Sequence, residues 1–99
     1  MNRLRLAATL IGRSALRYTP AGLPVCEAHC RYSGTVIEAG LERQLSFEFA
    51  AVAAGSVAER LERLALGSAL DLDGFLSTTS HRSNRLRIHI TEFTPVSGV

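Results

Sequence analysis

The chain has 99 residues, of which 46% are hydrophobic, and a net charge of +2 at neutral pH. This length allows one domain with a single core and excludes two, and no apolar run reaches the length of a membrane span. The charge is unevenly distributed. Residues 1–26 and 74–91 hold arginines and no acid, whereas residues 27–73 carry eight of the nine acidic residues. If the two ends of the chain pair, they form one basic face, which suits a polyanionic partner.

The amino-terminal segment alternates apolar and polar residues, which predicts a long first strand over Asn2–Ile11. Gly12 follows as a bend or bulge that lets one strand serve two parts of a sheet. The strand continues over Leu16–Thr19 and ends at the turn signal Pro20-Ala21-Gly22. Alternation resumes over Leu23–Tyr32 and predicts the second strand.

The middle of the chain changes its pattern twice. Ser33–Arg43 is punctuated by two glycines and predicts a loop, and Gln44–Val52 predicts a third strand. Ser56–Leu66 then has the spacing of an amphipathic helix, which Gly67 ends. In the third strand, the side chains expected to face inward are Leu45, Phe47 and Phe49.

The stretch from Leu70 to Ile90 predicts two strands joined by a basic loop. Ser68–Ser77 and Arg85–Pro95 each alternate apolar and polar residues, and Gly74 breaks the first run where a strand often bends. The connection Ser77–Asn84 contains only small or polar residues, so it has nothing to bury. It is too long for a two-residue turn and predicts a projecting finger.

Three strands, a short helix and two more strands describe an all-β domain, a five-stranded oligonucleotide-binding (OB) barrel with the helix between strands three and four. We expect residues 1–95 to form this single domain and residues 96–99 to form a flexible tail.

The two cysteines predict buried reduced thiols. Cys26 and Cys30 are about 13 Å apart at the rise of a strand, too far for a disulfide. His29 faces the other side of that strand, which disfavours a metal site. The expected compartment is therefore reducing. Residues 1–19, arginine-rich and acid-free, also have the composition of a mitochondrial transit peptide, so a cleaved organellar protein is an alternative.

The sequence predicts a binding protein rather than an enzyme. The carboxylates are scattered, the histidines have no nucleophile partner at a recognised spacing, and no glycine loop would hold a phosphate. Asp71 and Asp73 share a strand face, but a solvated face explains them better than a catalytic pair. No cofactor or metal is expected.

The candidate binding residues are arginines and aromatic side chains. The finger arginines Arg82, Arg85 and Arg87 would bind backbone phosphates. Arg13, Arg17 and Arg31 would join them if their strands lie beside the finger. Tyr18 and Tyr32 are the rings best placed to stack on a base, and Phe75 is a weaker candidate. Phe47, Phe49 and Phe93 are predicted in the core. With few stacking rings, affinity should depend on electrostatics.

Several segments resemble a known family. NRLRL, then LRYTPAGLPVCE, an A-G-x-x-R-Q stretch entering the third strand, and LGSALDLDGFLS before a basic loop are similar to the primosomal replication protein N (PriB) family. A more distant likeness is to bacterial single-strand-binding proteins. The likeness covers roughly residues 2–93, and RYTPAGLPV and GSALDLDGFL are its most specific parts.

The resemblance implies a non-catalytic homodimer of OB barrels that binds single-stranded DNA and associates with the primosomal helicase (PriA) and other primosome proteins. It implies a cytoplasmic, nucleoid-associated bacterial protein. Carried over by position, the DNA-binding regions are Arg31–Ser33, the Leu41–Phe47 region and Arg82–Arg87. These regions add Arg43 and Phe47 to the candidates.

The sequence departs from the family at expected DNA contacts. Leu41 replaces an aromatic residue near the end of the loop, Ser46 replaces a tryptophan that relatives can present, and the finger carries arginines in place of lysines. Two further functions therefore stay open. One is a protein-docking OB module with weak DNA binding, and the other is an RNA-binding OB domain.

Overall fold

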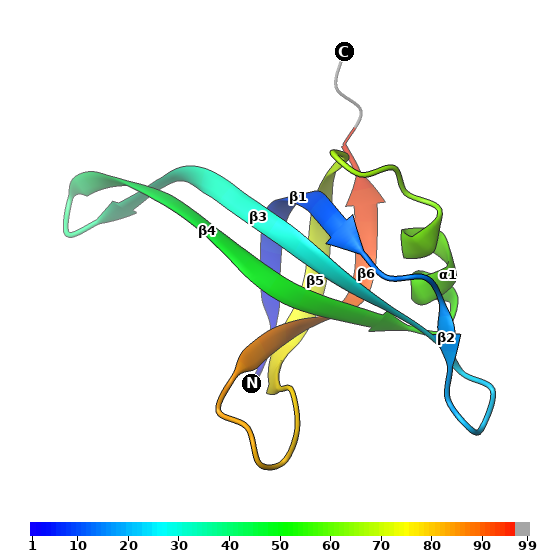
Figure 1. The fold of residues 1–99 in the computed structure, drawn as a ribbon. Helices are drawn as coiled ribbons and strands as arrows, with labels where there is room; N and C mark the ends of the chain where they lie inside the picture. The colour runs from blue at the N-terminus through cyan, green and yellow to red at the C-terminus, as the bar shows by residue number, and fades with distance from the viewer. Residues whose placement is uncertain (97–99) are drawn as a thin grey trace.

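The computed structural model describes residues 1–96 as a β-barrel from which a long two-stranded arm projects (Figure 1). In chain order the elements are β1 (Leu4–Arg13), β2 (Arg17–Tyr18), β3 (Pro24–Glu38), β4 (Leu41–Ala54), α1 (Ser56–Glu62), β5 (Ala69–Thr78) and β6 (Leu86–Pro95). Of the predicted tail, residues 97–99 lie outside this described part.

The barrel closes because β1 pairs with two different strands. Its first half pairs with β5, from Leu4 opposite Gly74 to Thr9 opposite Ala69, and its second half pairs with β3. A register shift between Leu10 and Gly12 marks the predicted bulge. The sheet order is β1-β5-β6-β4-β3-β2, closed by the β1–β3 pairing. The predicted five-stranded OB barrel is confirmed, and the two-residue β2 adds a short edge to β3.

The core fits small side chains against large ones. β3 and β4 contribute cysteines and alanines, whereas β1, β5 and β6 contribute leucines, isoleucines and Phe93. Leu61 of α1 is fully buried in the same core cluster. This alternation suits the taper of a small barrel. The small members are Cys26, Ala28, Cys30, Ala51 and Ala53.

Gly74 produces the predicted bend in β5. The β5–β6 register shifts between Asp73 and Gly74. A Cβ atom at Gly74 would lie 2.0 Å from the carbonyl oxygen of His89. Only glycine allows this close approach of the two strands.

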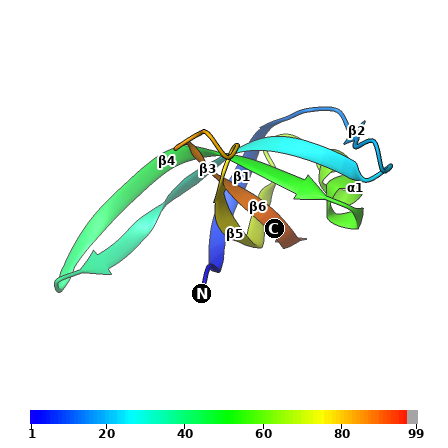
Figure 2. The ribbon, with the colours of Figure 1, turned by 90° about the horizontal axis from the view of Figure 1, so that it is seen from below.

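The predicted loop Ser33–Arg43 is wrong, because β3 and β4 continue their pairing as far as Glu38 opposite Leu41. The turn between them has only two residues, Ala39 and Gly40, with φ of 53° and 79°, the geometry of a tight hairpin. Thr35, Val36 and Ile37 favour an extended chain more strongly than the glycines disfavour it. The resulting arm extends and curves away from the barrel (Figures 1 and 2), and the molecule measures 50 × 40 × 21 Å.

The helix is shorter than the predicted Ser56–Leu66. It ends at Glu62, because the following residues turn back to bond β1: the Gly67 N–H donates to Leu10 O (2.7 Å), and the Leu10 N–H donates to Ser68 O (2.9 Å). These strand-like bonds compete with helix continuation. Across residues 1–96, the chain forms no helix with the length and apolar character needed to span a membrane.

Candidate nucleic-acid interface

The finger between β5 and β6 is a loop held by its own hydrogen bonds. The Thr79 N–H donates to Arg85 O (3.0 Å), and the Arg85 N–H donates to the Ser83 hydroxyl (2.9 Å). Arg82 and Arg85 are exposed and make no ion pair within residues 1–96. The predicted finger is confirmed as an element, and two of its three arginines are available to an anion.

Beside the finger, outward side chains of β3, β4 and β6 form what we call the outer sheet face: Glu27, His29, Arg31, Glu48, Arg87 and His89. The strand register brings these residues together, since Arg31 lies opposite Glu48, and Val52 lies between Glu27 on β3 and His89 on β6. Three predicted arginines, Arg17, Arg31 and Arg87, therefore lie on or beside one surface.

Two carboxylates balance these arginines. Glu27 lies between Arg17 (3.6 Å) and Arg87 (3.7 Å), and Glu48 accepts from His29 (3.0 Å) and from Arg31 (3.2 Å). The hydrogen bond from His29, followed by that from Arg31, lowers the pKa of Glu48. A phosphate arriving here must compete with Glu27 and Glu48 for the arginines.

Sequence reasoning missed this balance because it compared charges along the chain. The β3–β4 register places Arg31 directly opposite Glu48, and opposite charges at such a cross-strand position attract. An antiparallel alignment of the predicted strands Leu23–Tyr32 and Gln44–Val52 would have placed Glu48 opposite Arg31.

An aromatic cluster lies where the arm leaves the barrel. Tyr32 is opposite Phe47, with ring centroids 5.2 Å apart, and Phe47 is 6.0 Å from Phe49. Phe49 packs partly against the core, but Phe47 is 43% exposed. The prediction that Phe47 is core is wrong, because β4 continues past the end of the barrel. Phe93, 3% exposed, is core as predicted.

An apolar hollow of about 340 Å³ adjoins this cluster. Leu76 and Leu86, at the ends of β5 and β6 next to the finger, line it and are 42% and 60% exposed. Leu4 and Leu6 of β1 line the same hollow. Over residues 4–8, β1 pairs with β5 on one side, and no described strand pairs with the other. A free strand edge therefore borders an apolar surface.

The other predicted DNA-binding residues, Arg13, Arg43 and Tyr18, lie away from the aromatic cluster and the hollow. Arg13 donates to Leu64 O and so ties β1 to the segment after α1. Arg43 pairs with Glu38 near the arm tip. Tyr18, on β2, is 65% exposed. Arg13 and Arg43 therefore have partners within the protein, whereas the Tyr18 ring is open to a ligand.

The cysteines are buried and free, as predicted. Both face the barrel core, and burial raises the pKa of Cys30 to about 11. His29 faces outward and pairs with Glu48. Within the described 96 residues, no group of three metal-ligating side chains is assembled.

Comparison with known proteins gives consistent matches. A family model described as "Another single-strand binding protein family" matches residues 2–92. The replication restart protein PriB of Nitrosomonas europaea is 33% identical over 92% of this chain and 84% of that protein. The replication restart protein PriB of Bordetella pertussis is 34% identical over 99% of this chain and 92% of its own length.

Solved structures show the same fold. PriB from Ralstonia solanacearum superposes with a TM-score of 0.87 and 41% identity, covering 96% of this chain and 97% of that one. The single-stranded DNA binding protein from Thermus aquaticus gives a TM-score of 0.78 at 23% identity, with 99% of this chain on 51% of that one, a likeness of fold alone. The chain therefore belongs to the single-strand binding protein family, in the group of the replication restart protein PriB.

Proposed function

We propose that this protein binds single-stranded DNA as an accessory of replication restart. The observation that carries the proposal is the finger, whose Arg82 and Arg85 are exposed and unpaired among the described residues, beside the arginines of the outer sheet face. The relatives are named replication restart proteins, which supports this role. The chemistry needed is binding and positioning, and no catalytic step is assigned.

Phosphates would bind the finger first. Guanidinium groups make bidentate contacts to phosphate oxygens, and Arg82 and Arg85 have no carboxylate to displace within residues 1–96. Arg31 and Arg87 would bind further phosphates in exchange for Glu48 and Glu27. This competition lowers affinity and favours a strand that can be released.

Bases would stack on the aromatic cluster. Phe47 and Tyr32 form a paired surface next to the finger end of the barrel, and base stacking on aromatic rings tolerates any sequence. Tyr18 and Arg17 would take the strand at the opposite end of the outer sheet face.

We also propose a homodimer and a helicase partner. The free edge of β1 over residues 4–8 and the apolar hollow beside it suit antiparallel pairing with a second copy. The family resemblance supports association with the primosomal helicase PriA. The outer surfaces of the arm would remain available for it.

Fluorescence anisotropy with a labelled single strand, measured over a range of salt concentrations, tests DNA binding. Each phosphate contact contributes about −0.7 to the slope of log affinity against log salt. We expect about 3–5 contacts per strand, and hence a steep decrease in affinity with salt.

Two results would favour the other functions. A slope near zero, together with retained binding to purified helicase, would indicate a protein-docking module. Tighter binding of RNA than of DNA with the same base sequence would indicate an RNA-binding domain, because the fold itself does not choose between the sugars.

A further inference from the structure

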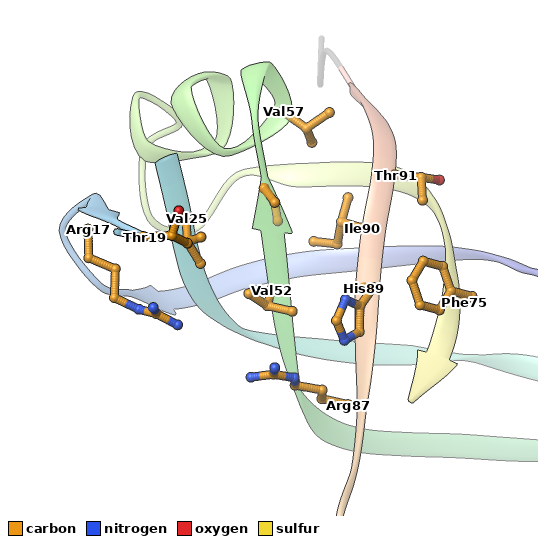
Figure 3. Close-up of a pocket in the computed structure, with 12 residues that line it drawn as sticks. Arg17, Thr19, Val25, Val52, Val57, Phe75, Arg87, His89, Ile90 and Thr91 are labelled. Atoms are coloured by element: carbon orange, nitrogen blue, oxygen red, sulfur yellow. The ribbon is translucent and has the colours of Figure 1, made fainter. Parts of the chain in front are cut away.

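A groove of about 500 Å³ lies on the outside of the barrel, lined by residues of β2 to β6 and of α1 (Figure 3). Its floor is apolar. Val25 and Val52 lie outside the core cluster, yet are only 7% and 5% exposed, and Val57 of α1 lines the same groove. The volume is in the range of small-ligand sites.

One wall of the groove is an aromatic stack. The His89 ring lies against Phe75, with centroids 4.7 Å apart and planes inclined by 15°. His89 lies between Phe75 and Val52 on the neighbouring strands (Figure 3), with Phe75 covering one face of its ring, and its side chain lines the groove. Burial, followed by the charge of Arg87, lowers the pKa of His89. The lowered pKa favours the neutral form of the imidazole ring.

The rim of the groove is cationic. Arg17 from β2 and Arg87 from β6 both line it. They share one carboxylate, Glu27, at 3.6 and 3.7 Å, which is longer than a normal hydrogen bond. The Arg87 Nε atom is buried and has no hydrogen-bond partner in residues 1–96. A phosphate at this rim would therefore meet two guanidinium groups whose shared contact with Glu27 is weak.

The groove also connects the two separated parts of the candidate interface. Arg87, on β6, lies two residues after the finger residue Arg85, and Tyr18 lies next to Arg17 on β2. A strand that leaves the finger toward β2 therefore crosses the groove.

We infer that this groove is a subsite for one unstacked nucleotide of the bound single strand, with the base against His89 and the apolar floor and its phosphate between Arg17 and Arg87. The inference rests on the proposed function, and it adds a position where a base is enclosed rather than laid on an open surface. The cationic rim, the aromatic wall and the continuity with the finger favour a nucleotide over a protein segment.

Photo-crosslinking tests the position of the base. A single strand that carries 5-iododeoxyuridine, irradiated with the full-length protein and digested with trypsin, should crosslink to His89 in the peptide that starts at Ile88. His89→Ala should weaken strand binding by about five-fold or more, the lower range for losing one base–aromatic stack. His89→Phe keeps a flat ring and should retain most of the affinity.

A second variant fills the groove without removing a contact. Ala54 is exposed at the end of β4 and lines the groove, so Ala54→Leu should fold normally yet weaken binding. The matched control is Ala69→Leu, which adds the same atoms at an exposed position of β5 outside the groove. Thermal melts of all variants would confirm folding.

The outcomes separate the inference from the proposed function. If the strand binds and crosslinks elsewhere, with His89→Ala and Ala54→Leu equal to the parent, the subsite is wrong and DNA binding stands. If no single strand binds at all, the proposed function itself fails. If only the binding of a poly-glutamate peptide responds to Ala54→Leu, the groove takes an acidic protein segment and the inference is overturned.

Discussion

Phe47 and Phe93 show how position decides what an aromatic residue does. Both occur in alternating strands and both are predicted to be core from sequence. Phe93 is 3% exposed and lies under Arg60, whose guanidinium carbon is 4.7 Å from the ring centroid. Phe47 is 43% exposed and contacts other aromatic rings. Strand periodicity assigns a face, but it cannot show where along the strand the barrel ends.

Replacing these two residues should separate stability from binding. Phe47→Ala should cost about 1–2 kcal/mol of unfolding free energy, because the half-exposed ring loses only part of its contacts. It should also weaken single-strand binding by about five-fold, since one stacking ring is lost. Phe93→Ala should cost about 3–5 kcal/mol, as for a fully buried ring.

Urea unfolding gives both stabilities, and anisotropy gives the affinities of whichever variants remain folded. An equal loss of stability in the two variants would show that Phe47 is packed as core after all. The aromatic cluster would then be structural rather than a binding surface.

The elements divide into those that local sequence determines and those that depend on pairing. The bulge near Gly12, the bend at Gly74 and the finger follow from short patterns, and all three are present. The arm and the end of α1 depend on pairing, within a hairpin for the arm and with the distant β1 for the end of α1. Residues 33–43 become strand because each half pairs with the other, and α1 stops at Glu62 because Gly67 bonds β1. Alternation along one segment does not show with which other segment it pairs.

The candidate site follows the same division. The arginines of the finger could be predicted because they are close in sequence and lack acids nearby. The ion pairs of Glu27 and Glu48 with arginines could not be read along the chain, since they form only across strands of the sheet. The groove beside His89 is lined by residues of six elements, β2 to β6 and α1, so no segment of the sequence indicates it alone.

The finger should contribute to binding and little to stability. Arg82→Ala and Arg85→Ala should each weaken strand binding at all base sequences alike, because phosphate contacts carry no base information. Each should also reduce the salt slope by about 0.7. Exposed substitutions of this kind change stability by less than about 0.5 kcal/mol.

Arg63→Ala is the matched control. It removes one positive charge from an exposed position after α1. Salt-dependent anisotropy and thermal melts compare the three variants. If Arg63→Ala weakens binding as much as the finger variants, only the net charge of the molecule matters, and the finger is not a specific contact.

At the scale of the whole molecule, the arm and the barrel give the protein an elongated shape of 50 × 40 × 21 Å with a free strand edge. Exposed edges invite pairing with another chain, so proteins usually cover or blunt them. Here the edge of β1 is bordered by Leu76 and Leu86, which line the apolar hollow. Apolar surface beside an open edge is stabilised when a second copy covers both.

We therefore expect the protein to sediment as a dimer at micromolar concentration. Leu86→Glu should shift it toward monomer, because a carboxylate would be buried without a partner in the interface. Leu66→Glu is the control, since Leu66 is also exposed, at 58% against 60% for Leu86, but lies after α1 and outside the hollow. Analytical ultracentrifugation measures all three proteins. A monomeric parent, or equal behaviour of the two variants, would show that this edge is not the contact between copies.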